Sequence, residues 1–569
     1  MKEIKLLSKG LFESKLLDSK ATTRSVSKKE KIWGHLIGPL GLIFVVNTIA
    51  ALVEKFFTQQ VGAMYGETNI EMVQAMGDKY AAVMTIAKVL SMLLSLLNGW
   101  LTQHTQSRQG RMRPWYLIFG FISIAIGMTI FLFPGNVLGE NYWYYFFILL
   151  IAYTTVGSTY FHLFREAIVS LTTRDAKEKM QVKFMRQLCW TLISGILIGM
   201  LVSMVVLPMW LEQDINGYPI LMIILSIVAI PLLLLEYYYT RERVIEDVKF
   251  VSKEQKVSIP LKEQMKALFT NKFYVLLLIL TIVGGIIDNF KGGNVQYFYI
   301  KFMLGGAEDW SMYTVYQVVT GIPLGIGAFA IYPLAKKFGV KNVSVVGYAL
   351  VFVGSLMGWM FPTNLPIVLV AGFITQMGML PHAYIFATLI LYVYDSIEHK
   401  SGYRLEGLLG LAIVAAVCAF IYAPFAGGYE SSILKLGFVD AKGVIPSQEV
   451  KDFMTSSFFV TDMIKALASL IILPFITVEK DLPKITADLK ERKRQKMIEN
   501  GEEWLDDDEL AAREAEEQKI IAEENRIHDL RVKCEKKGLD FDAENAKYFA
   551  KLAEKEEKAR VKAEKKSKK

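Results

Sequence analysis

Twelve long apolar stretches lie between Trp33 and about Ile476, and they constrain the fold more than any other feature of this 569-residue chain. A helix of about 20 apolar residues can cross the hydrocarbon core of a bilayer. In agreement, 53% of the residues are hydrophobic, above the roughly 45–50% of soluble domains. The sequence therefore predicts an all-α, multi-pass membrane protein. The predicted spans are 33–57, 80–102, 114–135, 143–171, 186–208, 218–240, 273–301, 310–335, 342–361, 365–395, 406–427 and 454–477.

The connections between these spans alternate between basic and nearly charge-free. Arg108, Arg111 and Arg113 follow the second span, whereas residues 135–141 after the third span contain no Lys or Arg. Because basic loops stay on the cytoplasmic side, both termini and the long central connection are predicted to be cytoplasmic, with the chain in the cell membrane. An even number of spans around one long middle loop gives two six-helix bundles, the layout of the major facilitator fold.

These assignments divide the chain into five regions. The last one is rich in Glu, Lys, Ala and Arg and is predicted to form solvated helix, as a docking segment or as a charged extension with no essential role. The regions are an N-terminal arm (1–32), an N-terminal bundle (33–240), a central loop (241–272), a C-terminal bundle (273–478) and the charged cytoplasmic tail (479–569).

The connection after the second span carries a recognisable motif, Ser107-Arg108-Gln109-Gly110-Arg111-Met112-Arg113-Pro114-Trp115. It resembles the signature of the glycoside-pentoside-hexuronide:cation symporters, the melibiose-permease-like branch of the major facilitators. Residues 171–179, 297–305 and 402–407 are similar to other parts of that family, so the resemblance covers roughly residues 33–478. It implies alternating-access transport of a sugar, glycoside or uronide.

The resemblance also implies two groups of functional residues. Arginines at the cytoplasmic face can bond exposed helix carbonyls and neighbouring acids, as a gate would require. The predicted gate comprises Arg108, Gly110, Arg111, Arg113, Asp395, Arg404 and Glu406. The predicted substrate-binding residues are Tyr153, Thr154, Arg186, Asp288, Asn289 and Lys291.

The chain departs from the family where the coupling cation is usually held. Ser91 and Ser95 occupy the positions of the expected span-two acids, and Gly157 that of the span-four acid. The family's sodium chemistry is therefore not expected here. Proton coupling and uniport both stay open.

A polar stripe on the second span includes Lys88, Ser91 and Ser95, which fall within roughly an 80° sector of a helix. Charged residues at mid-bilayer generally face a protein cavity. The stripe is predicted to line such a cavity, where Lys88 could replace the metal ion or attract an anionic substrate. The alternative is a helix-packing seam in which Lys88 pairs with an acid on a neighbour.

Further polar residues lie in the C-terminal spans. Asp288 and Lys291 are three residues apart and are predicted to pair along one helix, with glycines on both sides weakening that helix as at a binding site or hinge. Asp462 and Lys465 repeat the spacing and are predicted to form a structural pair. His382 could relay protons or could simply pack through a hydrogen bond.

The leading function hypothesis is a secondary transporter of a sugar, glycoside or uronide. The alternatives are a facilitator for lipids or other amphiphiles and a non-transporting membrane sensor. No P-loop, HExxH or GxSxG motif is present, so we predict no enzyme, cofactor or metal site. The net charge of +8 reflects tails and loops rather than nucleic-acid binding. The expected partners are a small carbohydrate, a coupling proton and the lipid bilayer, around a monomer.

Overall fold

The computed structural model describes residues 25–158, 209–242, 259–305, 311–402, 409–499 and 516–550, with gaps at 67–68, 106, 108, 111, 134, 212–213, 293, 441–443 and at several tail positions. It also describes short pieces near 6–17 and 168–189 and residue 206. Within this part of the chain every named element is a helix, so the expected all-α fold is confirmed.

The N-terminal half begins with a π-helical turn, η3 (Glu30–Ile37), that leads into α1. The fourth predicted span is helical from Tyr142 to Ser158, and of the fifth only Arg186, Cys189 and Val206 are among the described residues. The helices of this half are α1 (Leu40–Tyr65), α2 (Ile70–His104), α3 (Arg113–Leu132), α4 (Gly135–Leu138), α5 (Tyr142–Ala152), the π-helical continuation η5 (Tyr153–Ser158) and α9 (Gly217–Tyr239).

The C-terminal half starts with a short amphipathic helix, α11 (Leu261–Thr270). Its other helices are α12 (Lys272–Lys291), α13 (Asn294–Met303), α14 (Ser311–Phe338), α15 (Val340–Met360), α16 (Leu365–Tyr384), α17 (Phe386–Ser401), α18 (Leu409–Tyr422), α19 (Gly428–Lys435) and α20 (Gln448–Ile472). The charged α21 (Val478–Glu499) follows.

Among the described residues, eight helices are long and apolar enough to cross a membrane, or nine when α14, which bends by 47°, counts as one span. The two proline residues inside α14 account for its bend, because proline removes a backbone donor. The helix Tyr142–Gly157 is apolar but shorter. Together with α2 these helices follow the order of the predicted spans.

Two predicted boundaries differ most from the structure. α2 begins at Ile70 instead of residue 80, because Asn69 caps it by accepting a hydrogen bond from the Met72 amide at 3.2 Å. The seventh span does not run unbroken to residue 301. It ends at Lys291, where Gly292 takes a φ of +57°, and α13 starts as a separate helix.

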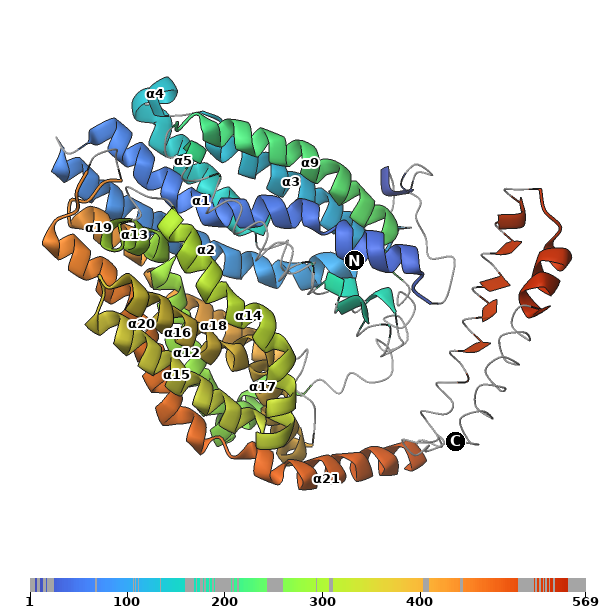
Figure 1. Ribbon diagram of the computed structural model, residues 1–569. Coiled ribbons are helices and arrows are strands. Elements are labelled where there is room, and N and C mark those ends of the chain that lie inside the picture. The colour runs from blue at the N-terminus through green and yellow to red at the C-terminus, as the bar shows by residue number, and fades with distance from the viewer. Residues whose placement is uncertain are drawn as a thin grey trace, which may run out of the picture.

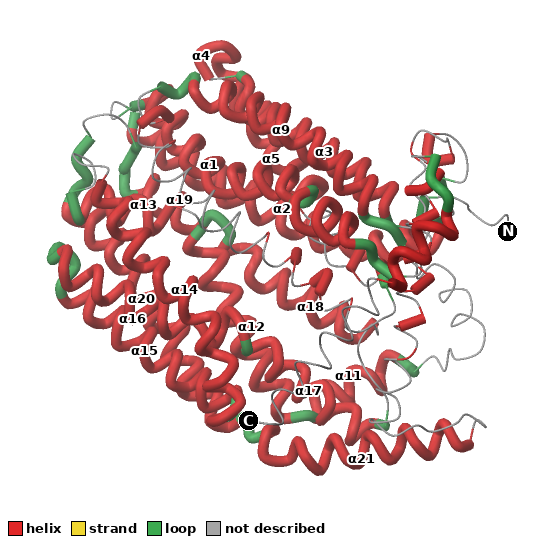
Figure 2. Tube along the Cα trace, turned by 45° about the vertical axis from the view of Figure 1, so that its right-hand side comes forward, coloured by secondary structure: helices red, strands yellow, loops and turns green. Residues whose placement is uncertain are grey.

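The two halves lie side by side near α13 and α19, and their described helices diverge toward α17 and α21 (Figure 1). The 45° view shows the same arrangement (Figure 2). The main contacts between the halves join α2 to α18 and α19, and α1 to α13. We call these two ends of the molecule the α19 end and the α21 end.

Each half contains the same capping device at the α21 end. In the N-terminal half, Glu242 follows α9 and accepts hydrogen bonds from the Met112 and Arg113 amides, both at 2.8 Å, at the start of α3. In the C-terminal half, Glu479 in the first turn of α21 accepts hydrogen bonds from the Val340 and Lys341 amides at 2.7 and 3.0 Å. A carboxylate suits a helix N-terminus, where backbone N–H groups are unpaired and the helix dipole is positive.

A glycine with positive φ precedes each capped helix. Gly110 has φ +119°, and a Cβ there would lie 2.5 Å from the Glu242 carboxyl carbon. Gly339 has φ +85°. Both turns therefore require glycine, and a proline lies at the start of α3, where its missing N–H has no intrahelical partner to lose.

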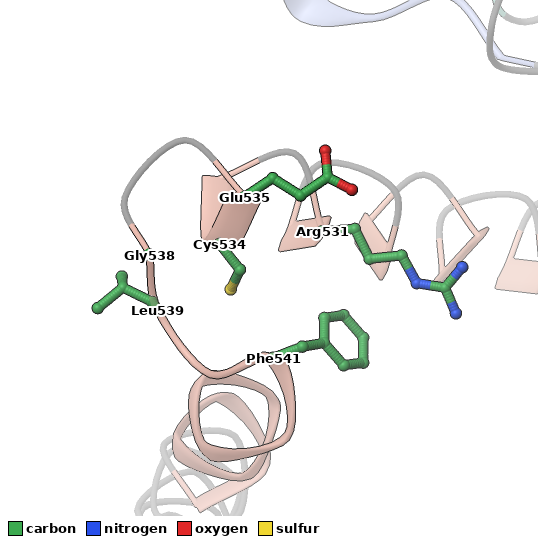
Figure 3. Close-up of a pocket in the computed structure, with 6 residues that line it drawn as sticks. All are labelled: Arg531, Cys534, Glu535, Gly538, Leu539 and Phe541. Atoms are coloured by element: carbon green, nitrogen blue, oxygen red, sulfur yellow. The ribbon is translucent and has the colours of Figure 1, made fainter.

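The described part of the tail is helical, with α21 resting on α17. His399 Nε2 of α17 and Asp488 of α21 share a hydrogen bond of 2.8 Å, and Arg492 donates a hydrogen bond to the His399 carbonyl. Farther on, a turn at Gly538 brings Cys534 and Leu539 to one side of an open hollow with Phe541 (Figure 3). This hollow is lined by tail residues alone.

Candidate functional site

Four charged side chains tie α12 to α20, but not in the predicted pairs. Asp288 accepts hydrogen bonds from Lys465 at 2.7 and 2.9 Å, and Lys291 pairs with Asp462 at 2.9 Å. The two intrahelical pairs expected from the i, i+3 spacing are therefore wrong. Each acid instead binds the lysine of the other helix, because α12 and α20 pack side by side and a direct ion pair across them suits both charges.

These crossed pairs differ in exposure. The Asp288 side chain is 61% exposed, whereas its partner Lys465 is 13% exposed. A carboxylate of a spanning helix does not face lipid, because burial of its charge in hydrocarbon is costly. We therefore expect Asp288 to face the protein interior instead of lipid.

His382 lies close to the crossed pairs. Its Nδ1 shares a hydrogen bond of 2.8 Å with the Tyr348 hydroxyl, which links α16 to α15. Lys465 and Asp288 are within electrostatic reach of the ring. Asn289 faces its own helix, because its side-chain amide donates to the Gly285 carbonyl at 2.8 Å.

The two serines of the predicted stripe on α2 bond to backbone. Ser91 donates to the Ala87 and Thr154 carbonyls at 2.8 and 3.0 Å and so joins α2 to η5. Ser95 donates to the Met92 carbonyl of its own helix at 2.7 Å. Lys88 is partly buried and forms no ion pair within the described residues, although the field of Glu54 on α1 reaches it.

Two of the predicted substrate residues lie inside the N-terminal half. Tyr153 is 5% exposed, and its ring faces α3, where a Cβ at Gly127 would lie 3.5 Å from it. Arg186 is also buried and pairs with Glu236 of α9, while its Nε donates to His35 Nδ1 at 3.0 Å. Both side chains stabilise packing between helices of one half.

The Arg186 cluster includes residues that the sequence did not single out. Glu236 is fully buried and also accepts a hydrogen bond from the Tyr116 hydroxyl, so one carboxylate joins α3, α9 and Arg186. Nearby, Arg241 pairs with Glu30 at 3.2 Å. In the sequence, Glu236 could have been recognised as an acidic residue near the end of an otherwise apolar span.

The predicted gate is described only in part. Arg108, Arg111, Arg404 and Glu406 lie outside the described residues. Arg113 is 1% exposed and donates to the Gln109 carbonyl at 3.1 Å and to the Tyr237 carbonyl, which fixes the turn before α3. Asp395 is partly buried on α17.

A second charged cluster joins the two halves at the α19 end. Asp440, in the loop after α19, pairs with the buried Lys55 of α1 and with Lys301 of α13 at 3.1 Å. Lys55 also lies over the Tyr297 ring, 4.1 Å from its centroid. Burial raises the pKa of Asp440, but Lys55 and Lys301 outweigh that effect and lower the pKa below its ordinary value. No residue spacing in the sequence indicates this cluster, because its members lie far apart in the chain.

Two helical halves of a membrane protein, joined at one end and carrying charged groups within their spans, define the class of major facilitator transporters. The family described as MFS/sugar transport protein matches residues 34–480, and the chain belongs to this family. The resemblance inferred from the motif after the second span is thereby confirmed.

Individual relatives are distant. The chain is 23% identical over 421 residues to an isoprimeverose transporter from Lactiplantibacillus pentosus, which covers 70% of this chain and 80% of that protein. It is 24% identical over 339 residues to a raffinose carrier protein from Pediococcus pentosaceus, covering 57% and 50% of the two chains. A solved D-xylose-proton symporter matches with a TM-score of 0.50 at 15% identity, over 77% of this chain and 98% of its own, which supports the fold.

Proposed function

We propose that the protein is a secondary active transporter that moves a sugar, glycoside or uronide across the cytoplasmic membrane by alternating access. The observation that carries this proposal is the family match over residues 34–480. The contacts between the halves at the α19 end suit a carrier closed on that side. The relatives' names make isoprimeverose and raffinose the first sugars to test.

The α21 end is the cytoplasmic side in this proposal. Lys336 and Lys337 in the last turn of α14 lie there, as does the strongly charged α21, and basic segments stay in the cytoplasm. Both termini and residues 241–272 then share one side. Cysteine labelling from each side of sealed vesicles tests this orientation, and it fails if the central loop and the tail react from opposite sides.

Solute contacts in this proposal come from α12, where Asp288 and Lys291 stand beside the helix break at Gly292. Carboxylate and ammonium groups are hydrogen-bond partners for sugar hydroxyls, and lysines attract the carboxylate of a uronide. Tyr153 and Arg186 would act indirectly, through the packing of the N-terminal half. Lys88 supplies a fixed positive charge where the family usually holds a cation, so uptake should not depend on sodium.

The test is uptake by purified protein in proteoliposomes. Radiolabelled isoprimeverose, raffinose, xylose and glucuronate are offered with a sodium gradient, a proton gradient or neither, and protein-free liposomes serve as the control. Accumulation of at least one of these solutes is expected, without sodium stimulation. Lack of uptake for the whole panel, with lysophospholipid movement instead, would show an amphiphile facilitator. Lack of any transport would contradict the proposal.

A further inference from the structure

Two buried glutamates, one from each half, meet at the α19 end. Glu54 lies on α1 and is 8% exposed, and Glu430 lies on α19 and is fully buried. A Cβ on residue 292 would lie 2.8 and 2.9 Å from the two Glu54 carboxylate oxygens and 3.2 Å from Glu430 Oε1. Both carboxyl groups therefore converge on the break between α12 and α13.

The contact between these carboxyl groups requires a proton. The Glu430 side chain is within hydrogen-bonding reach of Glu54 and of its own backbone amide. Neither Glu430 oxygen has a hydrogen-bond donor from another described residue. Two carboxylates cannot donate to each other, so the contact is a hydrogen bond only when one of them is protonated. Like charges this close in a buried site do not both ionise, as in carboxylate pairs that share one proton.

Buried hydroxyl groups surround the pair. The Tyr80 hydroxyl of α2 is fully buried, lies within electrostatic reach of both carboxyl groups and has no hydrogen-bond partner among the described residues. The Tyr429 hydroxyl, next to Glu430 in the chain, is buried and without a described partner in the same way. The structure thus provides polar groups that can exchange a proton, in a setting closed to solvent.

Most cations near the pair are already bound to other acids. Lys55 and Lys301 bind Asp440, Lys291 binds Asp462, and Lys435 binds Asp78. Lys88 is the remaining cation in the described part of these helices whose field reaches Glu54. One positive charge can balance one carboxylate, which leaves the second carboxyl to carry a proton. Titratable side chains on the elements around the pair include Lys55 (α1), Asp78, Tyr80 and Lys88 (α2), Lys291 (α12), Tyr297 and Lys301 (α13), Tyr429 and Lys435 (α19), Asp440 (following loop) and Asp462 (α20).

We propose that Glu54 and Glu430 form the proton-binding site that couples solute movement to the proton gradient, an inference that rests on the proposed transport function. A proton from the α19 side joins one carboxylate oxygen and forms an O–H bond, which allows the α19 end to close. When that proton leaves to water on the other side, two like charges remain across the contact between the halves. Their repulsion favours reopening of the α19 end.

The first experiment uses Glu430→Gln and Glu54→Gln, which keep the shape of the side chains but cannot gain or lose the proton. With one proton per sugar, a one-unit pH gradient drives about tenfold accumulation, since one pH unit is equivalent to a tenfold concentration ratio. Wild type should approach this value in proteoliposomes. Both variants should only equilibrate, to about onefold, while still exchanging labelled for unlabelled sugar. Asp78→Asn, an exposed acid at the same contact, is the control and should accumulate sugar like wild type.

The second experiment needs no sugar. Spin labels at Glu71→Cys and Glu449→Cys, exposed positions of the two halves at the α19 end, report their separation in full-length protein with the three native cysteines replaced by alanine. The distance should lengthen in wild type as the pH rises and should stay short at every pH in Glu430→Gln. Elution as a single folded species is checked for each variant.

The two experiments separate the possible failures. If wild type accumulates sugar and both glutamine variants accumulate it equally, the proton site is wrong and the transport function stands. If wild type moves no sugar but its pH-dependent opening is lost in Glu430→Gln, the proton site stands and the sugar function fails. A pH response identical in wild type and variant overturns the proton site.

Discussion

The two halves share a capping device but use their buried charges differently. In the N-terminal half, Arg186 and Glu236 are almost fully buried and join helices of that half. In the C-terminal half, Asp288 and Lys465 join α12 to α20, and the Asp288 side chain stays largely exposed. The comparison shows that a charged residue inside a span is no guide to function until its exposure and its partner are known. On this basis we expect the C-terminal half to present charge to a solute and the N-terminal half to support it.

Glu236→Gln should give the largest loss of stability. Removing one partner of a buried ion pair costs about 3–5 kcal/mol, because the other charge stays buried without compensation. Arg186 would be left in that position. Thermal unfolding in detergent should show a large drop in the midpoint, with Glu71→Gln on the exposed start of α2 as the unaffected control. If Glu236→Gln is as stable as wild type, the buried pair does not stabilise the N-terminal half and the difference between the halves does not hold.

Asp288→Asn should reduce transport strongly and stability little. Hydrogen bonds to charged groups contribute about 1.5–3 kcal/mol, so uptake per folded protein should fall by about 10- to 150-fold. Asp462→Asn is the matched variant, because its side chain is less exposed, at 29%, and its effect on uptake should be smaller. If Asp288→Asn instead lowers the unfolding temperature and leaves uptake per folded protein unchanged, the pair is structural.

Glu242→Ala and Glu479→Ala should each cost about 1–2 kcal/mol, as the loss of a helix cap does. Glu242 should cost more, since it is 5% exposed and Glu479 is only partly buried. Unfolding in detergent measures both values, and the Glu→Gln variants keep an oxygen acceptor as controls. A larger loss of unfolding free energy for Glu479→Ala would show that burial of the carboxylate does not decide which cap stabilises the protein more.

The smallest expected effect concerns the docking of α21. The hydrogen bond from His399 lowers the pKa of Asp488 below its ordinary value of 3.8. A carboxyl with a lowered pKa in the folded state stabilises that state above its ordinary pKa and loses the effect as the pH falls through the lowered value. Docking of α21 should therefore weaken only below about pH 4. The test is the protection of the α21 amides against hydrogen exchange at pH 3 and at pH 6. This protection should fall at pH 3 in wild type, and Asp488→Asn should show no such difference between the two pH values.

The sequence by itself determined most of the spans, because the length of an apolar run is a local property. Its glycines also indicated that the helix around residue 292 is weak, although the predicted seventh span ran on to residue 301. The runs from 342–361 and 365–395 reappear as α15 and as α16 with α17, and the glycines around residue 292 mark the end of α12. The motif ending at Trp115 also identified the family that matches residues 34–480.

Only the tertiary structure decided which charges meet. Asp288 and Lys465 are 177 positions apart, and Lys55 and Asp440 are 385 apart. Spacing along one helix favoured Asp288 with Lys291, but an ion pair forms with whichever opposite charge the packing brings within reach. The meeting of Glu54 with Glu430 depends in the same way on the closure of two halves. The spacing of residues within either helix cannot predict that contact.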